Sequence, residues 1–157
     1  MTIRFLIFGK AREDYLKSGF TEYAKRLSKY AKVSIETLNE ESIKIPNESN
    51  IARALDLEAT RALNQIKEND FLCLSDIHAP KVDTMGFARK LDGISSRNGN
   101  IVFLFGSSYG LSDRLRKRSD FSFSLSDLTF THYMALLITM EQVYRAMKIN
   151  HNEVYDK

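Results

Sequence analysis

Short apolar runs and amphipathic segments alternate along the whole chain, and this alternation most limits how the chain can fold. The runs with strand character are residues 2–8, 33–38, 71–74, 101–105 and 121–125. The segments with helical periodicity are residues 13–30, 51–66, 84–91, 112–118 and 133–149. Strands that alternate with helices favour a mostly parallel sheet covered by helices on both faces. The sequence therefore predicts an α/β fold.

The chain has the size of one domain and shows no internal division. Its 157 residues, 43% of them hydrophobic, can bury a core without disulfides, so we expect a single domain over residues 1–157. The single cysteine, Cys73, lies in an apolar run and suits a reducing cytoplasm. No segment approaches the roughly 20 apolar residues that cross a bilayer. We therefore expect a cytoplasmic protein with no membrane span.

The charge is small overall but unevenly distributed. A net formal charge of +3 is too weak to indicate a polyanionic partner. Residues 1–77 carry 12 basic and 12 acidic side chains, whereas residues 78–157 carry 11 and 8. The densest basic cluster is Arg114, Arg116, Lys117 and Arg118. On charge alone, a solvated helix face is favoured over a patch that contacts phosphate.

Ligands of open α/β sheets bind beyond the carboxyl ends of the strands, and one loop expected there is bracketed by glycines. Gly106 and Gly110 carry no Cβ, so their backbone can approach a ligand closely. The loop lacks the third glycine of a dinucleotide fingerprint and the Gly-Lys-Ser/Thr ending of a phosphate loop. An ordinary strand-to-helix turn explains the two glycines equally well.

A second loop at that edge, residues 126–132, leads into the final helix. His132 is a candidate ligand or base, although a histidine at a helix start is more often structural. The helix carries an apolar stripe from Leu136 to Met147, which fits a core or a dimer interface. No spacing of His, Cys, Asp and Glu matches a metal site, and no Ser or Cys stands in a nucleophile motif. We therefore expect neither metal nor covalent catalysis.

Four stretches of the sequence together resemble one family. They are residues 8–10, residues 19–27, residues 103–106 with Gly110 and Leu111, and the C-terminal run of residues 123–132, residues 141–149 and Tyr155. In this order and at this length, they resemble the RlmH-type family of large-subunit rRNA pseudouridine N3-methyltransferases, within the SPOUT superfamily. The match extends over nearly the whole chain.

The resemblance implies a fold and a cofactor that periodicity does not indicate. The implied fold is a SPOUT-type sheet flanked by helices, with a C-terminal trefoil knot, which is a rare exception among folds. The implied cofactor is S-adenosyl-L-methionine (SAM), held in the knot largely by backbone groups. The cofactor contacts carried over to this sequence are Leu74, Gly106, Leu125, Ser126, Asp127, Leu128, Thr129 and Phe130.

The resemblance also implies a substrate and a partner. The substrate is 23S rRNA within the ribosome, and the partner is a second copy of the chain, whose final helix packs against the first and completes the reactive site. The implied catalytic residues are His132, Tyr155 and Asp156, and the implied RNA contacts are Arg114, Arg116, Lys117, Arg118 and Arg145, with Lys148 beside them. Because the SAM sulfonium is already activated, the protein must chiefly orient the methyl group and help to remove a proton.

Three positions depart from the family pattern. Ser107 replaces the second glycine of a pair and adds a Cβ near the expected cofactor. Leu136 replaces an arginine and removes a permanent cation. Asp156 replaces the histidine of a terminal Tyr-His-Lys pattern with a group that is normally anionic.

Two other functions stay compatible with the sequence. One is a catalytically weakened homologue that binds SAM or the ribosome, an interpretation motivated by Leu136 and Asp156. Residues 126–132 and 141–149 keep the family pattern, apart from Leu136 outside them, and this favours an active enzyme over a weakened homologue. The other is a small-molecule nucleotide binder of flavodoxin-like shape, which rests only on the strand-helix alternation and on residues 106–110.

Overall fold

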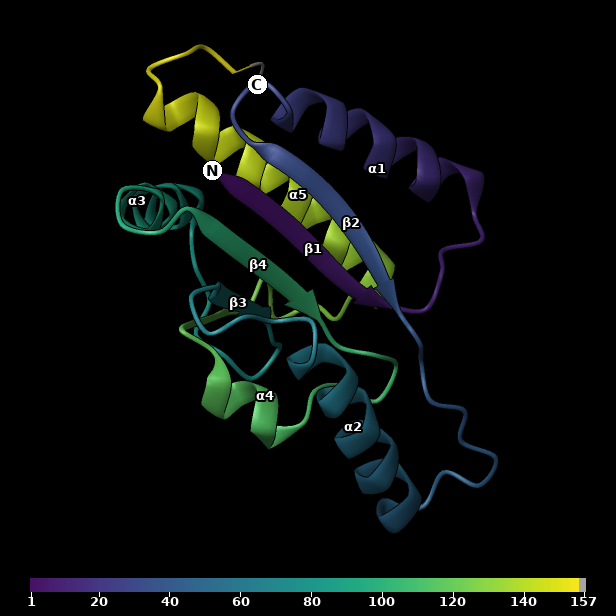
Figure 1. Cartoon of the computed structure of the whole chain (residues 1–157). Helices are drawn as coiled ribbons and strands as arrows, with labels where there is room; N and C mark the ends of the chain where they lie inside the picture. Colours follow the sequence, from purple (N-terminus) through teal and green to yellow (C-terminus); the bar gives the residue numbers. More distant parts are fainter. Residues whose placement is uncertain (156–157) are drawn as a thin grey trace.

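Parallel strands form the centre of the protein, whose computed structural model describes residues 1–155 (Figure 1). The strands are β1 (Thr2–Phe8), β2 (Lys32–Leu38), β3 (Phe71–Ser75), β4 (Asn100–Phe105) and β5 (Phe121–Phe123). They pair in the order β2-β1-β4-β3-β5, and each of these pairs is parallel. All of them therefore end at the same edge of the sheet, which we refer to as the carboxyl edge.

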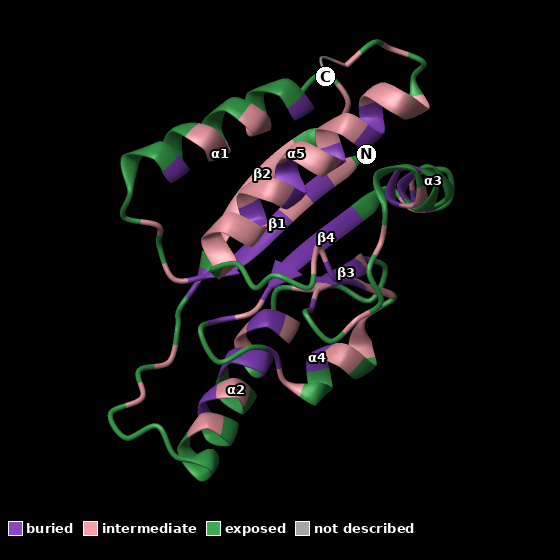
Figure 2. Cartoon of the chain, turned by 180° about the vertical axis from the view of Figure 1, so that it is seen from behind, coloured by how far each residue is buried: buried purple, intermediate pink, exposed green. Residues whose placement is uncertain are grey.

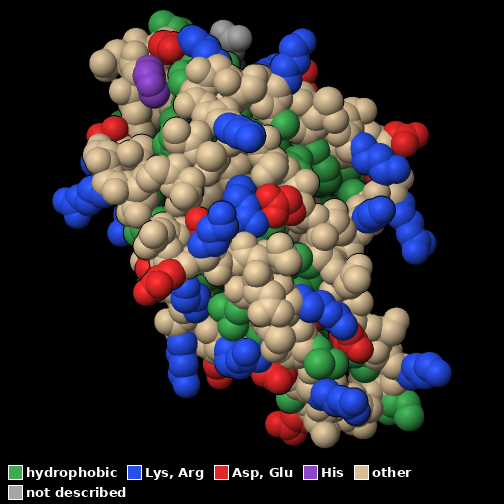
Figure 3. Space-filling view, viewed as in Figure 1, with side chains coloured by type: hydrophobic (Ala, Val, Ile, Leu, Met, Phe, Trp, Pro, Cys, Tyr) green, Lys and Arg blue, Asp and Glu red, His purple; other side chains and the backbone are tan. Residues whose placement is uncertain are grey.

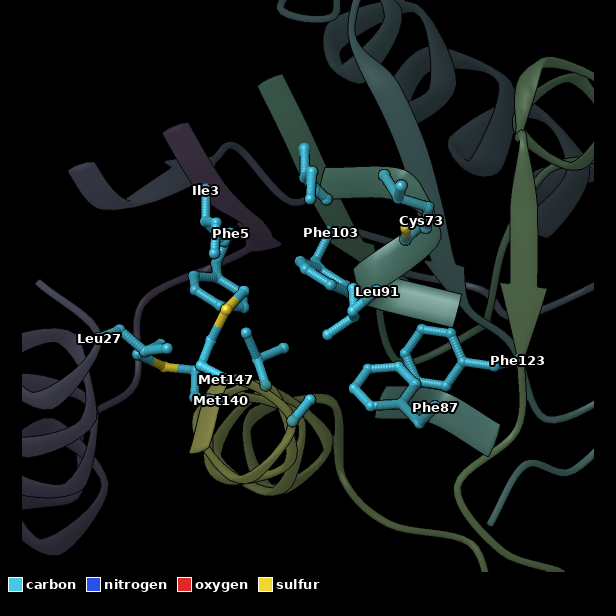
Figure 4. Packing of buried hydrophobic residues seen from close by; sticks show 14 of the residues in the cluster. Ile3, Phe5, Leu27, Cys73, Phe87, Leu91, Phe103, Phe123, Met140 and Met147 are labelled. Atoms are coloured by element: carbon cyan, nitrogen blue, oxygen red, sulfur yellow. The ribbon is translucent and has the colours of Figure 1, made fainter. Parts of the chain in front are cut away.

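Helices cover both faces of this sheet. They are α1 (Asp14–Leu27), α2 (Glu48–Leu63), α3 (Thr84–Ser95), α4 (Asp113–Arg118) and α5 (His132–Asn150). Strand residues such as Phe5 and Phe103 form one core with α1, α3 and α5, and Figure 4 shows Met140 and Met147 of α5 within it. The alternate strand residues, such as Leu6, form a second core with α2 and α4. This three-layer arrangement confirms the predicted α/β fold.

Burial on both faces explains the apolar sequence of the central strands. All residues of β4 from Ile101 to Phe105 are at most 1% exposed. Cys73 is fully buried in β3, as predicted, and burial raises the pKa of its thiol. Parallel strands between two helical layers have no solvent face, so they show no polar alternation.

Within residues 1–155, no helix is long and apolar enough to cross a membrane.

Several element boundaries differ from the sequence predictions, and three of the differences have a clear physical cause. Helix α2 begins at Glu48 because the side chain of Asn47 caps it, accepting a hydrogen bond from Asn50 N at 2.8 Å. Helix α3 continues past residue 91 to Ser95, which brings Ile94 into the core. Strand β5 ends at Phe123 because the next N–H, that of residue 124, leaves the ladder and donates to the β3–α3 loop at 3.0 Å.

The connection from β5 to α5 crosses the carboxyl edge. Strand β5 is the outer strand beside β3, yet α5 begins with His132 beside Phe8, at the end of β1. The connecting residues 124–131 therefore pass the ends of β3 and β4. On the way, Ser124 N donates to Pro80 O at 3.0 Å. The threading of this segment through a trefoil knot stays a prediction.

Helix α5 lies across one sheet face between α1 and α3 (Figure 2). Its residues Leu136, Met140, Val143 and Met147 are at most 2% exposed. The apolar stripe predicted for this helix is therefore core within a single chain. Helix α1 packs closely on α5 at Gly19, where an added Cβ would lie 2.8 Å from Leu137 Cδ1 and would require that side chain to move.

Leu136 gives a test of this packing. We expect Leu136→Ala to lower the free energy of unfolding by about 2–5 kcal/mol, because it leaves a cavity in a fully buried site. The matched variant Leu128→Ala removes a side chain that is 73% exposed and should cost less than about 0.5 kcal/mol. Urea unfolding followed by circular dichroism measures both. Equal losses in the two variants would contradict the burial of Leu136.

Candidate cofactor and catalytic site

Three loops leave neighbouring strands at the carboxyl edge. In the strand register, Ser75 at the end of β3 pairs with Phe105 of β4 and with Phe123 of β5. Neighbouring strands lie about 5 Å apart, so the loops that follow these residues start side by side. The loops are residues 76–83, 106–112 and 124–131. Seven of the eight predicted cofactor contacts therefore lie on two of these three loops.

The glycine loop, residues 106–110, is a tight turn. Ser107 N donates to Gly110 O at 3.2 Å, and Gly110 N donates to Ser107 O at 2.9 Å. A Cβ on Gly106 would lie 2.6 Å from Gly110 O, and Gly110 has a φ of +98°. The turn by itself therefore requires both glycines. Close approach of this backbone to SAM stays a prediction.

The side chain of Ser107 points away from α5. Its Oγ donates to Glu58 Oε1 at 2.7 Å, and Glu58 lies on α2, across the sheet from α5. The Cβ that Ser107 adds is therefore turned toward α2. Glu58 was not among the residues predicted for the site. The only trace of its role in the sequence is a carboxylate within a stripe of alanines on α2 that faces the sheet.

The segment of residues 125–130 offers backbone donors and apolar side chains. Leu128 is 73% exposed and Phe130 is 36% exposed, whereas Leu125 is half-buried. Of the backbone N–H groups in this segment, only that of Leu128 donates to an acceptor within residues 1–155, namely Ser126 Oγ at 3.0 Å. Unpaired backbone donors beside apolar side chains fit the edge and the faces of an adenine ring. The residues present are thus compatible with SAM.

A cleft of about 360 Å³ opens beside this segment. It is lined by Leu125 and Phe130, by Phe87 of α3, and by Ile138 and Gln142 of α5, among others. The side chain of Leu74, near the end of β3, does not line this cleft, because it is fully buried in the core against α2 and α4. Leu74 could therefore offer a ligand only its backbone.

His132 stands at the start of α5 with one ring nitrogen already engaged. Its Nε2 lies 3.0 Å from Phe8 O. A carbonyl oxygen only accepts, so the geometry assigns the proton to Nε2, and in the neutral ring Nδ1 can accept another proton. The residue before Phe8, Ile7, pairs with Phe105, which places His132 beside the start of the glycine loop.

Tyr155 lies far from His132 within one chain. Its hydroxyl donates to Glu141 Oε1 at 2.8 Å, and the Arg145 guanidinium stacks 4.1 Å from the centre of its ring. Burial and the Glu141 carboxylate raise the pKa of Tyr155. Glu141 is about 13 Å further along α5 than His132. The third predicted catalytic residue, Asp156, lies outside the described residues.

The predicted RNA contacts fall into two groups on opposite faces of the sheet, one on α4 and one, Arg145, on α5. The arginines of α4 are paired with carboxylates. The ion pairs are Arg114–Asp56 at 2.8 Å, Arg116–Asp76 at 2.7 Å and Arg118–Asp120 at 3.0 Å. Figure 3 shows acidic side chains interspersed among the basic ones on the face it displays. The cluster therefore also has a structural role, and within residues 1–155 only its Lys117 has no ion pair.

Asp76 is a second residue that the sequence analysis missed. It follows β3 directly and is 7% exposed. Its Oδ2 accepts from Arg116 Nε at 2.7 Å, its Oδ1 accepts from His78 N at 3.0 Å, and its own N–H donates to Phe123 O at 2.9 Å. Burial alone would raise the pKa of Asp76, but these donors lower it below its ordinary value. Asp76 therefore fixes α4 and β5 to the first of the three loops.

No group of three or more His, Cys, Asp and Glu side chains within residues 1–155 is arranged to hold a metal ion. Among the residues that the structure describes, the carboxyl edge brings together a histidine whose Nδ1 has no hydrogen-bond partner, a glycine turn and a segment with unpaired backbone donors. This combination can bind a nucleoside-like ligand and accept a proton next to it.

The fold is that of known methyltransferases. The chain is similar to a probable methylase family protein from Haemophilus influenzae, with a TM-score of 0.60 and 11% identity over 96% of this chain and 66% of that one. It is also similar to the tRNA (m1G37) methyltransferase from Aquifex aeolicus, with a TM-score of 0.54 and 16% identity over 92% and 70% of the two chains. At these identities, the likeness concerns the fold alone.

Sequence comparisons identify the family. A family model described as "Predicted SPOUT methyltransferase" matches residues 1–156. Proteins named "Ribosomal RNA large subunit methyltransferase H" from Ruminiclostridium cellulolyticum and Exiguobacterium sp. are 36% and 38% identical to the chain, each over 100% of both sequences. The chain therefore belongs to the SPOUT methyltransferases, within the group of these relatives. The resemblance seen in the sequence is confirmed, and the flavodoxin-like interpretation loses its support.

The Asp76–Arg116 pair predicts a pH dependence of stability. Because the pKa of Asp76 is lowered in the folded protein, its contribution is present above the unfolded pKa of about 3.9 and is lost as the pH falls through the folded value. We expect wild type to be more stable than Asp76→Asn at pH 7 and the difference to shrink toward pH 3. Urea unfolding across this range measures it. A difference that grows in acid would contradict the ion pair.

Proposed function

We propose that this protein is a SAM-dependent methyltransferase that modifies N3 of a pseudouridine in 23S rRNA of the assembled ribosome, as a cytoplasmic homodimer. The observation that carries the proposal is the meeting of His132, the glycine loop and residues 125–130 at the carboxyl edge. The full-length relatives named as large-subunit rRNA methyltransferases support the substrate.

The roles of the residues follow from their chemistry. When bound, SAM supplies an activated methyl group. The unpaired N–H groups of residues 125–130 can hold the edge of its adenine, and the exposed Leu128 and Phe130 can cover its faces. His132 Nδ1 is the group best placed to accept the proton that leaves the methylated nitrogen, because Nε2 is held by Phe8 O.

The separation of Tyr155 from His132 supports a homodimer. Within one chain, the tyrosine is bound to Glu141, far along α5 from the carboxyl edge. A second copy that packs against α5 would bring its own tail to the first copy's His132, and a two-fold interface would do the same in reverse.

The RNA contacts proposed here are Arg114, Arg116, Lys117, Arg118 and Arg145. Lys117 is exposed and can meet phosphate directly. The arginines can do so by sharing or exchanging their present carboxylate partners, because a guanidinium has five donors. Arg114, with a 46% exposed side chain, is the most accessible of the three arginines on α4.

A second candidate is a homologue that binds SAM but transfers the methyl group poorly. Leu136 favours it, because the first turns of α5 present a fully buried leucine where the family has a cation. The two candidates share the cofactor site and differ in turnover. Methyl transfer therefore separates them, and SAM binding alone does not.

Transfer of labelled methyl from SAM to ribosomes, followed by mass mapping of the rRNA, tests the proposal. The ribosomes come from a strain that lacks the modification. We expect His132→Ala to lower kcat by roughly 10²-fold, the usual effect of losing a general base, while SAM affinity stays within about twofold. The matched control is His151→Ala, at the opposite end of α5, where the ring binds Met147 O. It should leave kcat unchanged.

Each outcome has a clear meaning. Wild-type protein that neither binds SAM nor methylates rRNA rejects the proposal. Wild-type protein that binds SAM without methylating authentic ribosomes supports the second candidate instead. Equal activity of wild type and His132→Ala would remove His132 from the catalytic residues.

A further inference from the structure

A carboxylate is buried beneath the glycine loop. Glu58 of α2 is 3% exposed, and the other buried residues of this helix are Ala54, Ala59 and Ala62. Burial raises the pKa of Glu58 above its ordinary value. An ionisable group in such a setting is unfavourable unless its oxygens are hydrogen-bonded, so its partners indicate what the residue does.

Both carboxylate oxygens of Glu58 are engaged by loops at the carboxyl edge. Oε1 accepts from Ser107 Oγ at 2.7 Å, and Oε2 accepts from Glu41 N at 3.0 Å. Ser107 belongs to the glycine loop, and Glu41 belongs to residues 39–47, which follow β2. Glu58 therefore fastens two loops to one helix.

We propose that Glu58 is a positioning residue for the cofactor site, and that it acts by anchoring Ser107. The inference rests on the proposed function, because it concerns the loop that is proposed to contact SAM. The anchor holds the side chain of residue 107 toward α2 and leaves the loop backbone facing the neighbouring loops of the carboxyl edge. A loop already fixed in this form loses less conformational freedom when the ligand binds.

The remaining contacts of the glycine loop explain why an anchor is needed. Its two backbone hydrogen bonds join residues 107 and 110 to each other and do not tie the turn to the rest of the protein. Ser108 Oγ donates to Glu40 at 3.3 Å, but this contact is exposed to water. Within residues 1–155, the bond between Ser107 and Glu58 is the only buried side-chain hydrogen bond that the loop makes.

The hydrogen bonds also predict which substitutions are tolerated. In Glu58→Gln, the amide oxygen can accept from Glu41 N, and the amide N–H can donate to Ser107 Oγ, because a hydroxyl both donates and accepts. The anchor therefore needs shape and polarity, and it does not need the charge. Glu58→Ala and Ser107→Ala each remove it.

Calorimetric titration of the full-length protein with SAM tests the anchor. We expect Ser107→Ala and Glu58→Ala to weaken SAM binding roughly tenfold, because a loop without its anchor must lose more conformational freedom when the ligand binds. The double variant should bind no more weakly than Glu58→Ala, because both changes break the same contact. Glu58→Gln should bind within about threefold of wild type, as a hydrogen-bonded isostere. The control Asp56→Ala removes another carboxylate of α2, which pairs with Arg114 of α4, and should bind SAM normally.

Kinetics and stability separate positioning from a general structural role. In the methyl-transfer assay, Ser107→Ala should raise KM for SAM roughly tenfold and leave kcat at saturating SAM within about twofold. Normal SAM affinity in both alanine variants, with only a lower melting temperature, would overturn the inference and leave the proposed function intact. Additive losses of SAM affinity in the double variant would also overturn the inference. If Glu58→Ala does not fold, Ser107→Ala alone decides. Wild-type protein that does not bind SAM rejects the proposed function and this inference with it.

Discussion

The parallel pairing of the strands is the constraint on which the rest of the structure depends. Because every pair is parallel, the loops after β3, β4 and β5 leave the same edge of the sheet. Strand β5 lies at the outside of the sheet, whereas α5 starts beside β1, so the connection must cross that edge. The crossing brings residues 125–130 and His132 to the glycine loop. The candidate site is thus a consequence of strand order.

The elements could be predicted from the sequence, but their order in the sheet could not. Strands buried on both faces have continuous apolar sequences, and helices that pack on them have one apolar side, so both can be recognised locally. The position of β4 between β1 and β3 depends on pairing between distant segments and leaves no local signal. The ends of α3 and β5 were misjudged for the same reason, because Ile94 and Ser124 are held by tertiary contacts.

The sequence located the loops at the carboxyl edge, but it did not reveal the buried carboxylates. The glycine loop and residues 125–130 could be located because parallel strands place ligand loops after their carboxyl ends. Glu58 and Asp76 could not, because their burial depends on Ser107 and Arg116, which lie far away in the sequence. The same long-range pairing makes the basic run on α4 less free than its charge indicated.

The structure shows what two of the three departures from the family pattern do in the folded chain. Ser107 is directed away from the proposed cofactor side, and Leu136 completes the core under α5.

The proposed binding of SAM at the carboxyl edge is tested most directly by amide hydrogen exchange with and without SAM. If SAM binds there, it should protect the amides of residues 106–111 and 124–131 from exchange. Protection at the opposite edge of the sheet, in residues 64–70 and 96–99, or no protection at saturating SAM, would contradict this proposal.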